Sequence, residues 1–399
     1  MDREDFVALM SPAGQQLLGS VEYDSRADLV QLVSRLRAAG HEPALVAAVL
    51  TQLKLRHKAR AKFGDFAQRM ILTEPGLEQA SRLLVAALHA GRFRSAGAKS
   101  VADLGCGIGA ESLAFAGAGI RVSAYDIDEV TAAAATFNLL PFDNAVVEQR
   151  DVTTLDLNGF DALFFDPARR ELGGAARAKA VRKYDPDTYQ PNFDWVVSQC
   201  RGRTAGIKTG PGHPHEGIPQ EAEAQWVSVG GDLVELGLWF GGAARPGVAR
   251  SALLLSPDGS KHELNSPETN PAHAPLGPLS QFIFEPDNAV VRSHLIGQLA
   301  VATGTHSFSP EIAYLTGSEP VDSPWLRSYR LIEDLPFDRK KLKAQLRQRE
   351  IGVLEIKKRG ADIVPEQLRK ELALKGSNKA TLIVTRVADT HRALLCEAL

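Results

Sequence analysis

The chain has 399 residues, of which 44% are hydrophobic and 24% are charged, and its formal net charge is −2. Such a composition predicts a globular protein with a real core, and the near-neutral charge excludes a strong overall attraction to nucleic acid. At about 100–200 residues per domain, the length predicts two or three domains.

The cysteines and the N-terminus indicate the compartment. The three cysteines have no CxxC spacing, so neither a disulfide framework nor a zinc site is expected. The first residues, MDREDFVALM, lack the basic start and apolar core of a signal peptide. No stretch reaches the ~18–20 apolar residues of a membrane span. These features predict a cytoplasmic protein without a membrane partner.

Residues 1–95 are predicted to be helical. Residues 27–36 and 44–55 place apolar side chains three and four positions apart, as amphipathic helices do. Every second position from 54 to 62 is Lys or Arg, which predicts either a solvated helix face or a nucleic-acid contact. Thr73 is a suitable N-cap for one helix that continues through TEPGLEQASRLLVAALHAGRF.

From about residue 98 to 210, strands alternate with helices, beginning with SVADLG and GAESLAFAGAG. This alternation predicts an α/β fold with a parallel sheet covered by helices on both faces. Ligands of such sheets bind at the carboxyl ends of the strands. The later segments QWVSVGGDLVELGLWFGG and RSALLLSP have no helix between them and are predicted to be antiparallel strands, with a turn at 230–232.

Residues 256–280 are rich in Pro, Ser, Asn and Gly, which predicts a loop or a domain boundary. Beyond them, FDRKKLKAQLRQRE and PEQLRKELALK are predicted helices, and VLEIKKR and ATLIVTRV are predicted strands. Residues 336–379 contain 13 Lys or Arg and 6 Asp or Glu, a basic surplus of about seven. This surplus favours contacts with RNA phosphates, and a solvated charged face is the alternative.

The segment VADLGCGIG places glycines at 105, 107 and 109 directly after a strand, where the missing Cβ atoms let a ligand approach the backbone. Asp126 ends the next strand, where a carboxylate suits the two ribose hydroxyls of a nucleoside. Asp151 follows the third strand and suits an adenine amino group. Both NAD(H) and S-adenosylmethionine remain open, although the spacing is GxGxG and not the GxGxxG typical of NAD(H) sites.

DALFFDPARR ends a buried apolar strand with Asp166 and Pro167. A carboxylate at this strand end can accept a hydrogen bond from an amino or ring N–H, and the proline stiffens the adjacent backbone. The pair suits methyl transfer to nitrogen, because direct displacement at a sulfonium methyl mainly requires alignment of donor and acceptor. We therefore expect Asp166 to orient the acceptor and Pro167 to shape its pocket.

Together, DLGCGIG, AYDID, QRD and FFDPAR make residues 70–260 resemble class I S-adenosylmethionine-dependent methyltransferases. The whole chain is similar to bacterial methyltransferases with a THUMP-like C-terminal domain, relatives of the trimethylguanosine synthase group. The similarity rests on KFGDFAQRMILTEPGLEQAS, IKTGPG, FEPDNAVVR, PEIAYLTG, REIGVLEIKKRG and ATLIVTRV. It implies a helical region (1–95), a Rossmann-like seven-stranded methyltransferase core (96–260) and a small α/β RNA-binding domain (276–399).

The resemblance also implies a function, which is methylation of a base nitrogen in tRNA or rRNA, with guanine favoured and S-adenosylmethionine as cofactor. The residues expected around the cofactor are Thr73, Asp103, Gly105, Cys106, Gly107, Asp126, Ile127, Asp151, Val152 and Asp166. The residues expected to contact RNA are Lys357, Lys358 and Arg359. Two alternatives remain: a small-molecule or protein methyltransferase with an interaction module as its tail, and a non-catalytic RNA-binding protein. The sequence indicates no oligomeric state.

The fourth strand departs from the family pattern. Amino-group methyltransferases carry (Asp/Asn/Ser)–Pro–Pro–aromatic there, whereas this chain has Ala168 and Arg169 at the last two positions. Arg169 is expected to stack on the base or to hold a phosphate, and a solvated side chain is the alternative. Carbon-5 pyrimidine chemistry needs a nucleophilic cysteine near the base, which neither Cys106 nor Cys200 provides by its position.

The segment after the fifth strand holds three further polar candidates. His213 and His215 have no third partner for a metal, so we expect loop residues and no metal site. Lys208, in IKTGPG, is a candidate for binding a substrate phosphate.

Overall fold

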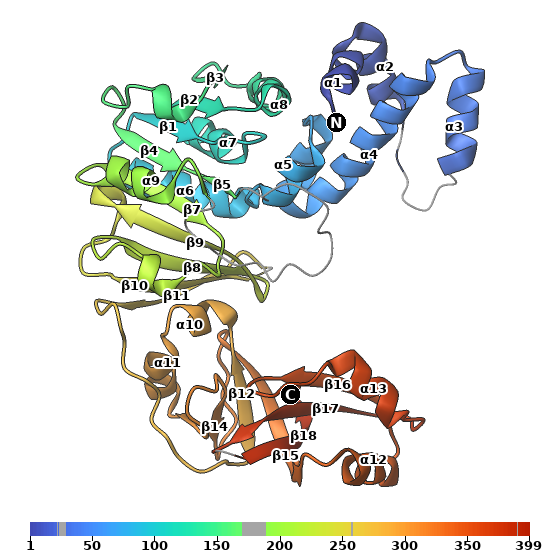
Figure 1. Cartoon of the computed structure of the whole chain (residues 1–399), viewed down its shortest axis with the longest axis vertical. Coiled ribbons are helices and arrows are strands. Elements are labelled where there is room, and N and C mark those ends of the chain that lie inside the picture. Colours follow the sequence, from blue (N-terminus) through green and yellow to red (C-terminus); the bar gives the residue numbers. More distant parts are fainter. Residues whose placement is uncertain (22, 24–28, 170–188, 257, 389) are drawn as a thin grey trace. The chain divides into compact units, whose positions relative to one another are not determined.

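The structure is a computed structural model that describes residues 1–21, 23, 29–169, 189–256, 258–388 and 390–399. The chain forms two compact units (Figure 1). The first consists of Met1–Thr209, His213–Pro219 and Leu238–Arg245, and the second of Gly210–Gly212, Gln220–Gly237 and Pro246–Leu399. None of the helices in the described ranges is long and apolar enough to cross a membrane.

The α-helices are α1 (Arg3–Met10), α2 (Pro12–Ser20), α3 (Leu29–Ala38), α4 (Pro43–Phe63), α5 (Glu74–Gln79), α6 (Leu83–Ser95), α7 (Ala110–Gly117), α8 (Glu129–Leu139), α9 (Phe193–Cys200), α10 (Asn288–Arg292), α11 (Ile296–Thr303), α12 (Arg339–Gln348) and α13 (Pro365–Leu372). Short 3₁₀ helices are η1 (Gly64–Arg69), η2 (Val152–Thr154), η4 (His215–Gly217) and η5 (Gly241–Ala243).

The strands are β1 (Ser100–Leu104), β2 (Arg121–Asp126), β3 (Ala145–Gln149), β4 (Ala162–Phe165), β5 (Ala168–Arg169), β6 (Tyr189–Gln190), β7 (Thr204–Thr209), β8 (Glu223–Val229), β9 (Asp232–Phe240), β10 (Arg250–Leu255), β11 (Lys261–Ser266), β12 (Phe282–Pro286), β13 (His306–Ser307), β14 (Leu315–Gly317), β15 (Leu326–Pro336), β16 (Ile351–Lys358), β17 (Asn378–Val387) and β18 (Thr390–Ala398).

The first sheet has nine strands in the order β11-β10-β8-β9-β7-β4-β1-β2-β3. β1 pairs in parallel with β2 on one side and with β4 on the other, β2 pairs in parallel with β3, and β4 with β7. The predicted α/β fold with a parallel sheet is therefore confirmed. β8 and β9 complete the seven expected strands, and β10 and β11 extend the sheet by two more.

One expectation for the end of this sheet was wrong, and another was wrong in part. RSALLLSP forms β10, which pairs in parallel with β8, because β9 first returns the chain to the end of the sheet at which β8 begins. Residues 256–280 are not a loop throughout, since β11 lies within them and pairs with β10 in antiparallel register.

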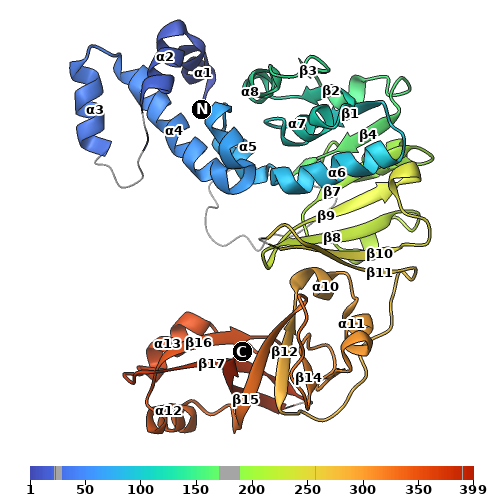
Figure 2. The same ribbon diagram turned by 180° about the vertical axis from the view of Figure 1, so that it is seen from behind.

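α6 runs along the first sheet (Figure 2). Aromatic side chains from both pack together in one buried cluster. Phe93 of α6 lies edge-on to Phe164 of β4 and to Phe115 of α7, with ring centroids 6.2 and 5.4 Å apart. Trp239 of β9 completes the cluster, and all four side chains are buried. This packing fixes β4, and with it the backbone at the carboxyl end of that strand.

The helix predicted from Thr73 to residue 93 is interrupted. It forms α5 and α6, which are separated at residues 80–82. Lys62 of α4 donates from Nζ to the backbone oxygens of Leu77, Glu78 and Ala80 at 2.8, 2.9 and 2.7 Å. A cation thus takes the place of the amide donors that a continuing helix would supply, which is why α5 can end here. The helices predicted over 27–36 and 44–55 correspond to α3 and α4.

The second sheet has seven strands in the order β13-β14-β12-β15-β18-β17-β16. β12 pairs with β14 and β15, and β18 with β15 and β17, in antiparallel register, whereas β16 and β17 are parallel. Leucines of α12 and α13 pack on this sheet in one apolar cluster. These two helices and β16 and β17 are the elements expected from the sequence.

Candidate functional site

The glycine turn follows β1 and joins it to α7. Gly105, Gly107 and Gly109 have φ values of 93°, 55° and 85°, a region in which other residues are strained. The amides of Gly105 and Cys106 both donate to the backbone oxygen of Tyr125 at 2.9 Å. A Cβ on Gly105 would lie 2.7 Å from the backbone oxygen of Asp166, so the turn and the end of β4 approach each other closely.

Asp126 ties the turn to the end of β2. Its Oδ2 accepts from the amide of Gly107 at 2.9 Å, and its Oδ1 accepts from the amide of Asp128 at 2.9 Å. Burial raises the pKa of the Asp126 carboxyl, although these amide donors oppose the rise. The neighbouring Ile127 is exposed.

Asp151 lies beyond the end of β3, where its exposed carboxylate accepts from Thr153 N at 2.9 Å and from Thr153 Oγ1 at 2.7 Å. These hydrogen bonds lower the pKa of the Asp151 carboxyl. Val152, beside it, is buried. These residues line one pocket together with the glycine turn and with Asp166.

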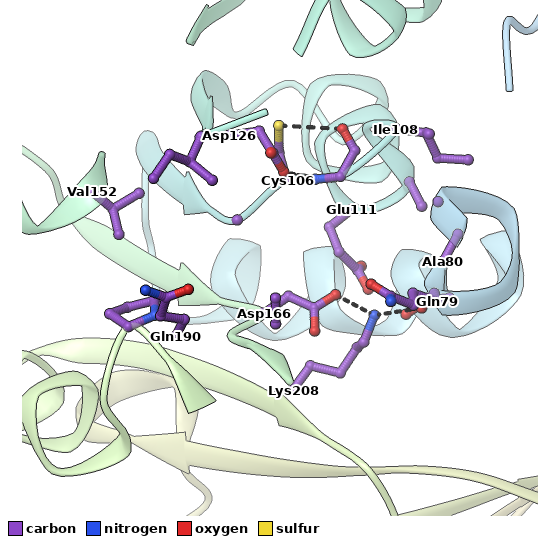
Figure 3. A pocket seen from close by; sticks show the side chains of 18 of the residues that line it. Gln79, Ala80, Cys106, Ile108, Glu111, Asp126, Val152, Asp166, Gln190 and Lys208 are labelled. Atoms are coloured by element: carbon purple, nitrogen blue, oxygen red, sulfur yellow. Dashed lines mark hydrogen bonds and ion pairs between the residues drawn. The ribbon is translucent and has the colours of Figure 1, made fainter. Parts of the chain in front are cut away.

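Asp166 continues the direction of β4, and its amide donates to the backbone oxygen of Leu104 at 3.1 Å. Its Oδ2 lies 2.5 Å from Nζ of Lys208, at the end of the neighbouring strand β7. Lys208 also donates to the backbone oxygen of Gln79 at 3.1 Å (Figure 3). The candidate for a phosphate contact is therefore an ion-pair partner of Asp166. Pro167 is buried beside it.

Two predicted residues support the pocket from outside its lining. Thr73 caps α5 by accepting from the amide of Gly76 at 3.1 Å. Asp103 is fully buried, and its Oδ2 accepts from Ser112 Oγ at 2.5 Å. Among the described residues, its Oδ1 has no hydrogen-bond partner. Burial raises the pKa of Asp103 to about 8.

Cys106 lines the pocket, but burial raises the pKa of its thiol well above the usual value. The thiol is therefore a weak nucleophile.

Part of the pocket wall was not predicted from the sequence. Gln79, Ala80 and Ser81 line the pocket because the helix is interrupted there, and Gln190 and Pro191 line it from β6 onward. Glu111 of α7 also lines the pocket, and its Oε2 lies 3.2 Å from Nδ1 of His89. One feature indicated Glu111, since it is the single charged residue in the helix AESLAFAG.

Comparisons with known proteins identify the family. Residues 326–398 match a family model described as THUMP domain-like, and residues 2–59 match a domain of unknown function, DUF8688. Over 365 residues, the chain is 30% identical to an uncharacterized S-adenosylmethionine-dependent methyltransferase of Mycobacterium tuberculosis, found in strains CDC 1551 and H37Rv. The alignment covers 88% of this chain and 95% of the relative. The chain belongs to the S-adenosylmethionine-dependent methyltransferases.

A solved structure shares the fold of this methyltransferase over nearly its whole length. It is that of a proposed methyltransferase from Porphyromonas gingivalis W83, with 19% identity, a TM-score of 0.71 and coverage of 99% of this chain and 98% of that one. The mycobacterial relative confirms the predicted enzyme class and the cofactor S-adenosylmethionine, and the family match confirms the THUMP-like character of the C-terminal part.

The three basic residues expected to contact RNA differ in their surroundings. Lys357 Nζ lies 2.7 Å from Glu285 Oε2, and its side chain is only 16% exposed. Arg359 donates to the backbone oxygen of Ala313 and lies over the ring of Tyr314. Lys358 is exposed. Of the three, Lys358 is the side chain that most readily reaches an external phosphate.

The remaining candidates from the sequence include His213 and Arg169. His213 is buried and packs on the ring of Phe193, with centroids 4.8 Å apart. No group of three His, Cys, Asp or Glu side chains among the described residues could hold a metal ion. The backbone of Arg169 pairs with Tyr189, and its side chain lies outside what the structure describes.

Proposed function

We propose that this methyltransferase transfers a methyl group from S-adenosylmethionine to a base nitrogen of tRNA or rRNA, with guanine as the favoured base. The observation that carries the proposal is the position of Asp166. Its carboxylate lines the same pocket as the glycine turn, at the carboxyl end of β4, where it is paired with Lys208.

The pocket suits the cofactor chemically. A Cβ on Gly107 would have nothing within 4 Å, so a ligand has room there, and the Asp126 carboxylate is fixed at the end of β2 with lone pairs left for ribose hydroxyls. Asp151 would accept from the adenine amino group, and Cys106, Ile127 and Val152 would contact the nucleoside. Thr73 and Asp103 would act by holding α5 and the turn in place.

Methyl transfer by direct displacement requires the acceptor nitrogen in line with the sulfonium methyl. The Asp166 carboxylate would accept a hydrogen bond from the acceptor N–H and take up the proton that the nitrogen loses. Lys208 keeps that carboxylate in place, because its ammonium contacts both Asp166 and the backbone of Gln79. Pro167 would restrict the adjacent backbone, and Arg169 would contact the base or a phosphate.

The RNA assignment is supported by the C-terminal part of the chain. Its match to a THUMP domain-like family coincides with the basic surplus of residues 336–379. Phosphate contacts dominate protein–nucleic acid affinity, so a basic surplus in a chain of net charge −2 favours an RNA partner. We propose accordingly that residues 1–95, 96–260 and 276–399 form a helical region, the catalytic core and an RNA-binding domain in the cytoplasm. Lys357, Lys358 and Arg359 would contribute to RNA binding.

Nucleoside mass spectrometry on tRNA and rRNA, from cells with and without the gene, tests the proposal. We expect one N-methylated nucleoside, a methylguanosine first of all, to disappear on deletion and to return with the wild-type gene. Complementation with Asp166→Ala should fail although the protein still binds S-adenosylhomocysteine. Asp161→Ala is the matched control, because Asp161 lies just before the first residue of β4, at the end of the strand opposite Asp166. Complementation with this variant should restore the nucleoside. Unchanged RNA nucleosides in the deletion would favour a small-molecule or protein substrate.

A further inference from the structure

Glu111 is a buried carboxylate on the wall of the cofactor pocket. It lies in the first turn of α7, directly after the glycine turn, and its exposure is 3%. Its Oε1 has no hydrogen-bond partner among the residues that the structure describes. Burying a charged oxygen without a hydrogen-bond donor costs more free energy than burying a neutral one. We therefore expect a bound ligand to supply the donor for this oxygen.

The other side of the carboxylate is fixed. His89 Nδ1 lies 3.2 Å from Oε2, and the imidazole packs between the rings of Phe164 and Trp239 at 5.5 and 5.1 Å. Burial alone would raise the pKa of Glu111, but the charge and hydrogen bond of His89, with Lys208 and Ser81, outweigh it and lower the pKa. Glu111 is therefore an anion in a rigid setting, with one oxygen held by His89 and the other unpaired.

The neighbouring side chains indicate which donor suits that oxygen. Glu111 and Lys208 extend into the same end of the pocket, beside Gln79 (Figure 3). A ligand at this end thus meets a negative and a positive side chain. The amino-acid part of S-adenosylmethionine carries an ammonium and a carboxylate, and it is the part of that cofactor with charges of both signs.

We propose that Glu111, oriented by His89, binds the α-ammonium group of the cofactor's methionine part. The glycine turn leads directly into the helix that carries Glu111, so a cofactor lying against the turn is within reach of this side chain. The inference requires only the methyl donor, so the outcome of the RNA experiment does not bear on it.

Calorimetric titration of the full chain tests this assignment with two ligands. S-adenosylhomocysteine carries the amino-acid part, and 5′-methylthioadenosine is the matching nucleoside thioether without it. Glu111→Gln should weaken S-adenosylhomocysteine binding by about 10- to 100-fold, the range for a lost hydrogen bond to a charged group, and leave 5′-methylthioadenosine binding unchanged. Glu129→Gln is the matched control, since Glu129 occupies the first turn of α8 but does not line the pocket, and it should alter neither affinity.

A purely structural role for Glu111 predicts a different result, namely equal weakening of both ligands, and this would overturn the proposal. The wild-type protein gives a second test that needs no variant. Its affinity for 4-(5′-adenosylthio)butanoate, which lacks only the amino group of S-adenosylhomocysteine, should be lower by the same factor. Glu111→Gln should bind that analogue as the wild type does. If the wild-type protein bound S-adenosylhomocysteine and 4-(5′-adenosylthio)butanoate equally well, the ammonium contact would be refuted.

Discussion

Replacing Asp103 by asparagine should change how the stability of the core depends on pH. Asp103 is fully buried, burial raises its pKa to about 8, and one of its oxygens has no partner among the described residues. A neutral carboxyl explains that unpaired atom better than a carboxylate does, because a buried charge needs compensation. The asparagine side chain would be neutral at every pH, so the pH dependence that Asp103 contributes would vanish in the variant.

The sign and the size follow from proton linkage. Below the ordinary pKa of 3.8, Asp103 is protonated in both the folded and the unfolded chain, and its contribution to stability is fully present. Between about pH 4 and 8, the unfolded chain releases the proton while the folded chain keeps it. The free energy of unfolding then falls by about 1.4 kcal/mol per pH unit as the pH rises. Above pH 8 both states are ionised and no further loss occurs.

Urea unfolding at pH 5, 6, 7 and 8, followed by tryptophan fluorescence, measures this slope. The stability of Asp103→Asn relative to wild type should rise by about 1.4 kcal/mol per pH unit across this range. Asp161→Asn is the control, because the Lys99 amide and Ser100 lower the pKa of the Asp161 carboxyl. Its effect should be constant above pH 5. A difference between Asp103→Asn and wild type that does not vary with pH would show that Asp103 is ionised in the folded protein.

Two further substitutions test the walls of the pocket. Gly105→Ala should abolish measurable S-adenosylhomocysteine binding in calorimetry, because its Cβ would meet the backbone oxygen of Asp166 at 2.7 Å. Gly119→Ala, with a similar φ of 80° and nothing within 4 Å, should bind normally, and equal loss in both variants would contradict this reason. Lys62→Met should lower the free energy of unfolding by about 1–3 kcal/mol, since the backbone oxygens at the end of α5 lose their donor. Lys58→Met removes an exposed ion pair in which Lys58 Nζ lies 3.5 Å from Glu74 Oε1. It should lower the free energy of unfolding by less than about 1 kcal/mol in the same urea titration.

Much of the fold was predictable because it depends on local patterns. Alternating strands and helices predicted the parallel sheet, and the N-cap at Thr73 and the helices α12 and α13 lie where their sequences indicate. The interruption between α5 and α6 was not predictable in this way. It depends on Lys62, which lies eleven positions before Thr73 in the sequence and meets α5 only after α4 has packed beside it.

The residues of the pocket also differ in how far the sequence predicts them. The glycines, Asp126 and Asp166 could be predicted because each lies at the carboxyl end of a strand, where parallel sheets bind ligands. Glu111 was missed although it is the single charged residue of α7, because helix periodicity predicts an apolar buried face and its partner His89 belongs to a different helix.

The pairing of Lys208 with Asp166 shows what one further piece of information would have added. The sequence places each residue at or near the carboxyl end of a strand, but it does not say that β4 and β7 are neighbours. In the structure Phe165 pairs with Ile207, so the next residue on each strand is brought to the same edge of the sheet. This register places Lys208 beside Asp166. A role for Lys208 in holding the Asp166 carboxylate therefore follows from the strand pairing, without a substrate phosphate.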